Sequence, residues 1–395
     1  MSAPNSNTDG SFAADFHYTD PDCLRNPWDL YTRLQLDQPV ARSERHGGYW
    51  ILTRYADVVR AACDTATFAS APGVVLPAYA SPAPLLPFEA DPPRHTKYRM
   101  LLMPHFTRAA LAPFEPVAQA IADSWLEQLS GRDRCDLVTE YVLPFAASTF
   151  AAHLGVPEAD WPRTVEWARA FVQLPPDARR VRDALGAFDS YLAAQLQLRA
   201  DAPGRDLLTS IATASIDGEP LTATERHGLA FTLIAAGIET TLLALGSAVA
   251  YLAGYPVAQQ QLATEPARIP AAVEEFLRSD GPAAGHVRTL TRDVDLHGQR
   301  LRAGERVLLL WAAASHDRNV FADPGAVRLG RSPNRHVAFG VGPHRCIGAP
   351  LARLEMQVGL ERLLARQPRF TLDPSEPTVA YHAARGPARL PVILG

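Results

Sequence analysis

The segment around Cys346 carries the residue types best suited to chemistry. From Phe339 to Gly348 it reads Phe-Gly-Val-Gly-Pro-His-Arg-Cys-Ile-Gly, and an apolar series with helical spacing follows it. A thiolate just before a helix is stabilised by unpaired backbone N–H groups and by the positive end of the helix dipole. The glycines at 340, 342 and 348 let the backbone approach a flat molecule without a clash from a Cβ atom. A thiolate that binds haem iron has these requirements.

Two other interpretations of this segment are weaker. The Gly-x-Gly at 340–342 lacks the third glycine of a dinucleotide-binding fingerprint, because Arg345 stands there, and no strand-turn-helix pattern surrounds it. A lone cysteine is most often an inert buried thiol, and only the surrounding spacing argues against that interpretation for Cys346.

A second candidate lies in a long apolar stretch, where Glu239 is the one charged residue between Leu229 and Gly254. The middle of this stretch reads Ala236-Gly-Ile-Glu-Thr-Thr241. A threonine hydroxyl can bond the carbonyl four residues back, here that of Ala236, and bend the helix. Gly237 would leave room for a small ligand against the backbone, and a buried Glu239 would have its pKa set by its surroundings, as a proton carrier requires. The alternative is a loosely packed helix with a salt-bridged glutamate.

The same stretch is long enough to cross a membrane, since roughly 20 apolar residues suffice. No Lys/Arg cluster flanks it to orient a span, and a carboxylate in the middle of a span is costly. We therefore expect a helix that runs through the centre of a large soluble protein.

Composition sets the broad class of the protein. The chain has 395 residues, of which 47% are hydrophobic and 20% charged, so it can bury a sizeable core. The formal net charge of −4 argues against a nucleic-acid binder. Four cysteines without a CxxC pair argue against a zinc ribbon or a disulfide scaffold. The polar N-terminus resembles no signal peptide, so we expect a cytoplasmic protein whose residues 1–15 are frayed.

The elements that must position these residues are mostly helices. We expect a mainly α protein with small β-sheets (α+β), a single large helical globule over residues 16–395. A proline-rich irregular loop is expected at 71–93, where it covers something apolar. Helices are expected at 26–36, through 107–201 with breaks at prolines, at 222–254 behind a Thr-x-x-Glu capping box, at 270–279 and at 349–367, and β segments at 48–52, 287–296 and 307–310.

The chain resembles the cytochrome P450 family. The family's haem-ligand signature, Phe-x-x-Gly-x-His-x-Cys-x-Gly, is matched at every position by 339–348, and Ala236-Gly-x-Glu-Thr-Thr resembles the oxygen-binding helix with its acid–alcohol pair. Glu275-x-x-Arg278, with Arg331, resembles the family's buried ion network. The segment 91–99 resembles the one that opens a helix beside a haem edge in bacterial members. One departure is Ser315-His-Asp317, where bacterial relatives usually show Asn-Arg-Asp.

The resemblance implies a haem b cofactor with Cys346 as the iron ligand. Four basic residues would meet the two haem propionates as cationic donors, namely His95, Arg99, Arg288 and His344. The full set of implied cofactor-binding residues is His95, Arg99, Ala236, Gly237, Arg288, Phe339, Gly340, His344, Cys346 and Gly348. Glu239 and Thr240 would be catalytic, relaying protons to bound oxygen. The residues expected to contact substrate are Thr232, Ala235, Ala236, Ala284 and His286.

The implied activity is a monooxygenase that inserts one atom of O2 into a hydrophobic small organic substrate. Electrons would come from a separate ferredoxin and an NAD(P)H-dependent ferredoxin reductase. Arg335, Arg345, Arg353 and Arg362 would form a basic dock for the ferredoxin. Two alternatives stay open: a haem-thiolate peroxygenase that uses hydrogen peroxide, and a non-enzymatic haem protein that binds or senses a ligand.

Overall fold

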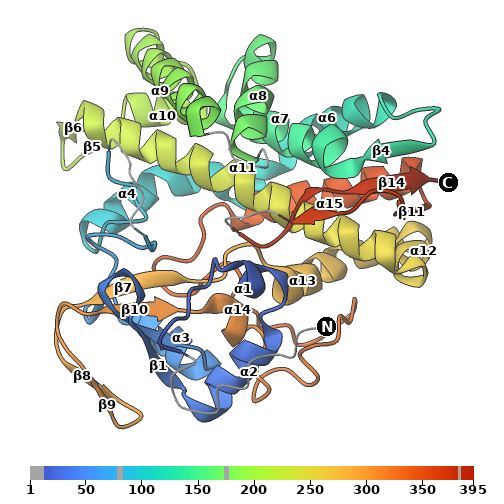
Figure 1. The fold of residues 1–395 in the computed structure, drawn as a ribbon. Helices are drawn as coiled ribbons and strands as arrows, with labels where there is room; N and C mark the ends of the chain where they lie inside the picture. Colours follow the sequence, from blue (N-terminus) through green and yellow to red (C-terminus); the bar gives the residue numbers. More distant parts are fainter. Residues whose placement is uncertain (1–12, 78–82, 173–177, 381–383) are drawn as a thin grey trace.

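A long central helix, α11 (Ala223–Gly254), organises the molecule, and the other elements pack around it (Figure 1). The computed structural model describes residues 13–77, 83–172, 178–380 and 384–395. The predicted capping box starts α11, because the Thr222 side chain accepts a hydrogen bond from the N–H of Glu225 and the Glu225 carboxylate accepts one from the N–H of Thr222. Within the described residues α11 is the one helix long and apolar enough to cross a membrane, but 61% of its most apolar window is buried inside the protein. It is a core helix, as predicted.

Helices make up most of the remaining structure. Those that pack against α11 include α7 and α9 on one side and α13 and α15 on the other (Figure 1). The helices other than α11 are α1 (Pro21–Arg25), α2 (Trp28–Asp37), α3 (Tyr55–Cys63), α4 (Arg94–Leu102), α5 (Arg108–Leu111), α6 (Glu115–Glu127), α7 (Leu143–Leu154), α8 (Trp161–Val172), α9 (Ala178–Asp201), α10 (Leu207–Ala212), α12 (Pro256–Thr264), α13 (Ile269–Asp280), α14 (Trp311–Ala314) and α15 (Ala349–Arg366).

Small sheets complete the fold. The largest has five strands in the order β1-β2-β10-β7-β3, and a three-stranded sheet has the order β11-β14-β4. The strands are β1 (Val40–Ser43), β2 (Tyr49–Leu52), β3 (Phe68–Ala69), β4 (Arg134–Asp136), β5 (Ser215–Ile216), β6 (Glu219–Pro220), β7 (His286–Leu290), β8 (Val294–Leu296), β9 (Gln299–Leu301), β10 (Arg306–Leu309), β11 (Phe370–Leu372), β12 (Val379–Ala380), β13 (Pro387–Arg389) and β14 (Pro391–Leu394). Because side chains alternate along a strand, His286 and Arg288 of β7 lie on the same face of the large sheet.

The mainly α architecture with small sheets is confirmed. The helices predicted at 26–36, 222–254, 270–279 and 349–367 correspond to α2, α11, α13 and α15, whose ends differ by one or two residues. No helix or strand lies in the described part of the loop 71–93. The strand β4 and the C-terminal strands were not predicted. The N-terminal segment 1–15 was expected to be frayed, and residues 1–12 of it lie outside the described chain. Ala13, however, is buried in an apolar cluster with Phe16, so the prediction was wrong for Ala13.

Candidate active site

The loop before α15 is closed by short backbone hydrogen bonds that fix the position of Cys346. The N–H of Cys346 donates to the carbonyl of Phe339 at 2.8 Å, and the N–H of Arg345 donates to that of Gly342 at 3.0 Å. Gly342 has a φ of 78°, and a Cβ there would lie 2.7 Å from the carbonyl oxygen of Ala62. Glycine is therefore needed at 342 both for the left-handed backbone and for the close approach of α3.

The thiol of Cys346 is accessible although much of the protein surrounds it. Its side chain is accessible to solvent, yet burial raises the pKa of the thiol, so protein atoms surround it on most sides. Hydrogen bonds from the N–H groups of Gly348 and Ala349, together with the charge of Arg99, act in the opposite direction and favour the thiolate. The start of α15 thus supplies the backbone donors that the sequence predicted.

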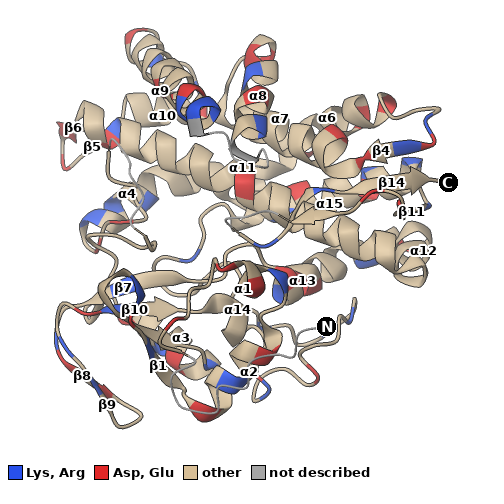
Figure 2. Cartoon of the chain, viewed as in Figure 1, with Lys and Arg blue, Asp and Glu red and all other residues tan. Residues whose placement is uncertain are grey.

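The middle of α11 also borders an open space. Ala235, Ala236 and Thr240 are exposed, although the helix is buried on both sides of them, at Leu233 and at Thr241. The Thr240 hydroxyl donates to the carbonyl of Ala236 at 2.7 Å, as predicted. Figure 2 shows one acidic band in the otherwise uncharged central part of α11, in keeping with a single charged residue there.

That residue, Glu239, is half-buried and interacts with other groups of the protein. An accessible hydroxyl and a half-buried carboxyl therefore lie next to each other on a helix that is otherwise apolar.

The reason for glycine at position 237 differs from the prediction. A Cβ at Gly237 would lie 2.2 Å from Cε2 of Phe150, which belongs to α7. The ring of Phe150 therefore fills the space that was expected to hold a small ligand, and the prediction that the missing side chain makes room for that ligand was wrong. The neighbours Ala236 and Thr240 keep the accessible positions.

The four basic residues predicted to meet the propionates come together. The rings of His95 (α4) and His344 lie 3.9 Å apart between centroids, and both interact electrostatically with Arg99 and Arg288. Burial, reinforced by these positive neighbours, lowers the pKa of His95 to about 4 and that of His344 to about 3. In the protein alone both rings are therefore neutral and the cations of the cluster are Arg99 and Arg288, whereas the role of all four residues toward the propionates stays a prediction.

The anion described near this cluster is Asp91, which acts on His95 and Arg288 from a distance while its carboxylate accepts hydrogen bonds from the N–H groups of Ser70 and Ala71. Arg288 is 2% exposed, its Nε has no hydrogen-bond partner, and its Nη1 donates only to the carbonyl of its neighbour Val287. Burial lowers the pKa of Arg288 to about 10. Both ring nitrogens of buried His95 are unpartnered as well, and neither Arg99 nor Arg288 has an ion pair within the described residues. Because an unpaired buried guanidinium is costly, the cluster fits a ligand that brings carboxylates, as the haem propionates do.

Of the residues predicted to contact substrate, three have accessible side chains. Ala235 and Ala236 are exposed, and His286 is half-buried. Thr232 is 8% exposed and donates to the carbonyl of Gly228, and Ala284 is 6% exposed within an apolar cluster, so in this structure neither faces open space.

The sequence did not predict the partner that orients His286. Nε1 of Trp311 donates to Nδ1 of His286 at 2.9 Å, and the ring of Phe88 meets the imidazole edge-to-face. Burial lowers the pKa of His286 to about 3. The ring is therefore neutral with its proton on Nε2, which makes Nε2 a hydrogen-bond donor. Only the pairing of β10 with β7, which brings Leu309 opposite His286, reveals this arrangement.

The predicted buried ion network is present. Arg278 donates to both oxygens of Glu275 at 2.8 and 2.9 Å, and Nε of Arg331 lies 3.0 Å from each of them. The unusual Ser315-His316-Asp317 segment is fully engaged: the Ser315 carbonyl accepts from Arg278, His316 stacks on Trp28, and Asp317 accepts from the N–H of Tyr55.

The predicted basic dock is only half available. Arg353 donates to Glu274 and lies over the ring of Phe339, and Arg362 donates to both oxygens of Asp123. Arg335 and Arg345 are exposed and form no ion pair in the part of the chain that the structure describes.

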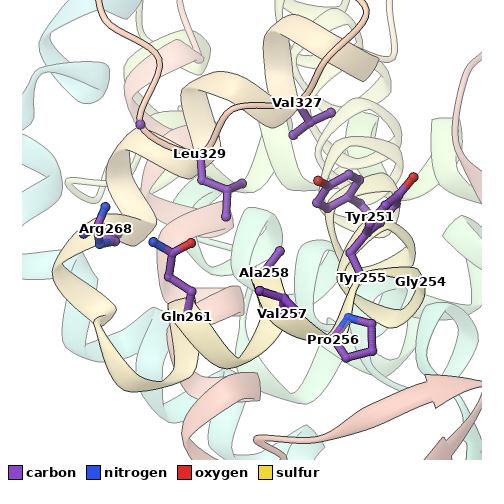
Figure 3. A pocket seen from close by; sticks show the side chains of 11 residues that line it. Tyr251, Gly254, Tyr255, Pro256, Val257, Ala258, Gln261, Arg268, Val327 and Leu329 are labelled. Carbon is purple, nitrogen blue, oxygen red and sulfur yellow. The ribbon is translucent and has the colours of Figure 1, made fainter.

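A surface groove of about 530 Å³ at the C-terminal end of α11 is separate from these residues (Figure 3). It lies between Tyr251 and Tyr255 on one side and Val327 and Leu329 on the other, and none of the predicted site residues lines it.

Comparison with known proteins gives a consistent result. The family model described as Cytochrome P450 matches residues 188–380. The chain is 34% identical to the Vitamin D(3) 25-hydroxylase of Pseudonocardia autotrophica, over 94% of each chain. It is 33% identical to the Erythromycin C-12 hydroxylase of Saccharopolyspora erythraea, over 93% of this chain and 94% of that one. Among solved structures, cytochrome P450 CYP109Q5 from Chondromyces apiculatus is similar with a TM-score of 0.86 and 32% identity, over 97% of this chain and 99% of that one.

Proposed function

The chain belongs to the cytochrome P450 family, and from this membership we propose that it is a cytoplasmic, ferredoxin-dependent monooxygenase of hydrophobic organic compounds. As a member of the family it is an oxidoreductase that binds haem b and uses O2. The observation that carries the proposal is the thiol of Cys346, which is accessible, surrounded by protein and supplied with backbone N–H donors. We also propose that residues 16–395 act as one domain, since α11 packs against helices from both halves of the chain.

Cys346 is the proposed iron ligand, and the N–H groups of Gly348 and Ala349 stabilise its thiolate. Arg99 and Arg288 bind the propionates as cations, and His95 and His344 donate N–H groups to them. When bound, the haem supplies O2 binding, reductive activation and insertion of oxygen into a C–H bond.

Glu239 and Thr240 are the proposed proton carriers. The Thr240 hydroxyl donates a hydrogen bond to the carbonyl of Ala236, so its oxygen can accept a hydrogen bond on the exposed side of the helix and hold a proton-bearing group there. Glu239, next to it and half-buried, can take up a proton from solvent and release it toward that side. A peroxygenase or a ligand sensor would have no need of this acid–alcohol pair, which favours the monooxygenase.

The proposed substrate is a hydrophobic compound with at least one oxygen acceptor. The exposed methyl groups of Ala235 and Ala236 favour apolar contacts, and Nε2 of His286 supplies one hydrogen-bond donor. Similar proteins are named for vitamin D(3), mycinamicin IV and erythromycin, which are the first compounds to try. Optical titration should reveal a binder through the blue shift of the Soret band that marks loss of iron-bound water. No shift with any such compound would contradict this substrate class.

The proposed redox partner is an acidic ferredoxin that docks at exposed Arg335 and Arg345. Its rate of haem reduction should fall as ionic strength rises, and Arg345→Gln should weaken that dependence. A reduction rate indifferent to salt would argue against electrostatic docking.

Cys346→Ser tests the proposal directly. The variant should lose the red-shifted Soret band that the reduced wild-type protein forms with carbon monoxide, because that band requires a thiolate ligand. Cys63→Ser, which changes another exposed cysteine, should keep the band. Survival of the band in Cys346→Ser would overturn the assignment.

A further inference from the structure

A polar layer lies inside the core where α7, α11 and α15 meet. At one end of the contact a Cβ at Gly359 of α15 would lie 2.8 Å from Leu245 of α11 and 3.1 Å from Phe145 of α7. At the other end the ring of Phe150 covers Gly237 of α11. Between these two tight apolar contacts each helix carries a buried polar side chain, namely Thr149 of α7, Thr241 of α11 and Glu355 of α15, and the last two interact.

The members of this layer follow from helical spacing. Residues four apart lie on the same face of a helix. On α11, Thr241 therefore lies between Gly237 and Leu245. On α7, Thr149 lies one turn from Phe145, and on α15, Glu355 lies one turn from Gly359. The hydroxyl of Thr241 interacts with the carboxyl of Glu355, which confirms that the two faces meet. The exposed fractions are 0% for Thr149, 4% for Thr241 and 1% for Glu355.

No cation in the described part of the chain forms an ion pair with Glu355. Its Oε1 is buried without a hydrogen-bond partner, as is Oγ1 of Thr149. Charged groups of α13 and α6, which pack on α15, are engaged elsewhere. In α13, Glu274 pairs with Arg353, Glu275 with Arg278 and Asp280 with Arg385, and in α6, Asp123 and Glu127 pair with Arg362 and Arg366.

Along the facing helices the titratable groups nearest to Thr241 and Thr149 are Glu239 of α11 and His153 of α7. The influences that act on the Glu355 carboxyl are burial and the hydroxyl of Thr241. Burial raises the pKa of Glu355 to about 8. A charged carboxylate in this place would be costly, since neither an ion pair nor a set of donors would compensate it.

We infer that Glu355 is held as an uncharged carboxylic acid and that, through Thr241, it fixes the accessible segment of α11 relative to the helix that follows Cys346. Thr241 is the direct neighbour of Thr240, and α15 begins three residues after Cys346. One buried contact therefore ties the proposed iron ligand to the proposed proton carriers. Glu355 is a positioning residue, and this positioning role rests on the proposed function, whereas its ionisation state does not.

The ionisation state can be measured by infrared spectroscopy of the haem-loaded protein at pH 7. The wild-type protein should show the carbonyl stretch of a protonated carboxyl, Glu355→Gln should lose it, and Glu361→Gln on the same helix should keep it. An unchanged band in Glu355→Gln, or no such band in the wild type, would overturn the inference.

Stability gives a second readout of the same state. A carboxyl whose folded-state pKa is raised contributes fully below the unfolded value of about 4.3 and loses that contribution as pH rises to about 8. The melting temperature of Glu355→Gln should therefore rise relative to wild type across this range. A difference that does not change with pH would contradict an uncharged Glu355.

The positioning role is tested by Thr241→Val and Glu355→Leu against the conservative Glu355→Gln. The first two should keep haem content but release several-fold more peroxide per nicotinamide oxidised, whereas Glu355→Gln, a neutral hydrogen-bonding mimic, should stay close to wild type. Wild-type coupling in Thr241→Val would overturn the positioning role even if Glu355→Leu failed to fold. If Thr240→Ala were also fully coupled, the proposed proton carriers themselves would be wrong.

Discussion

Arg353 holds Glu274 with two hydrogen bonds, from Nε at 2.6 Å and from Nη2 at 2.9 Å, and so joins α15 to α13 next to the cysteine loop. His336 donates to the same carboxylate at 3.0 Å. Burial alone would raise the pKa of Glu274, but the hydrogen bonds from Arg353 and His336 lower it to about 2.

This pairing predicts an acid-sensitive contribution to stability. A carboxyl with a lowered folded-state pKa stabilises the fold above its unfolded value of about 4.3 and loses that contribution as pH falls toward 2. Glu274→Gln should therefore cost at most about 3 kcal/mol at pH 7 and progressively less below pH 4. Denaturant unfolding at several pH values measures this difference. The exposed pair Glu265–Arg268 offers a control, since Glu265→Gln should cost well under about 1 kcal/mol.

Gly237→Ala should destabilise the protein because the new methyl group would collide with Phe150. Overpacking of this kind costs about 1–3 kcal/mol. Phe150→Leu in the same chain should recover part of the loss, since a smaller side chain vacates the space, and thermal unfolding of the three variants forms the double-mutant cycle. Strictly additive effects would mean that the two residues do not compete for this space.

Arg288→Leu should weaken haem retention without destabilising the apoprotein. The variant removes a buried guanidinium that forms no ion pair within the described residues and has Asp91 only as a more distant carboxylate, so the apoprotein should be as stable as wild type or more so. The same change removes the proposed charged hydrogen bond to a propionate, and its loss should speed haem transfer to apomyoglobin by about tenfold or more. Arg300→Leu on the exposed β8–β9 hairpin is the matched control. Wild-type retention in Arg288→Leu would remove Arg288 from the propionate site.

Local spacing was enough to predict several features of the fold and site. The Thr222–Glu225 capping box and the bond from Thr240 to Ala236 join residues three or four apart on one helix, so periodicity alone places them. The Glu275 network was reached through the family's motif.

What the sequence could not predict depends on contacts between elements. A glycine in the interior of α11 signals a close neighbour, but only the packing of α7 identifies it as Phe150. In the same way, Trp311 meets His286 because β10 pairs with β7, and Glu355 meets Thr241 because α15 packs on α11. These pairs are far apart in the chain, and no local pattern relates them.

Thr240→Ala should separate electron use from product formation. The exposed hydroxyl is the proposed proton carrier next to bound oxygen. The fold should not depend on it, because the hydroxyl donates to the carbonyl of Ala236 in its own helix. The variant should keep the haem spectrum and the substrate-induced shift, but several-fold more of the reducing equivalents should appear as hydrogen peroxide. Thr240→Ser, which retains the hydroxyl, should restore most of the coupling. The measurement is peroxide release and product formation per nicotinamide oxidised. Equal coupling in wild type and Thr240→Ala would show that Thr240 does not deliver protons. Glu239 would then have no partner through which to pass a proton.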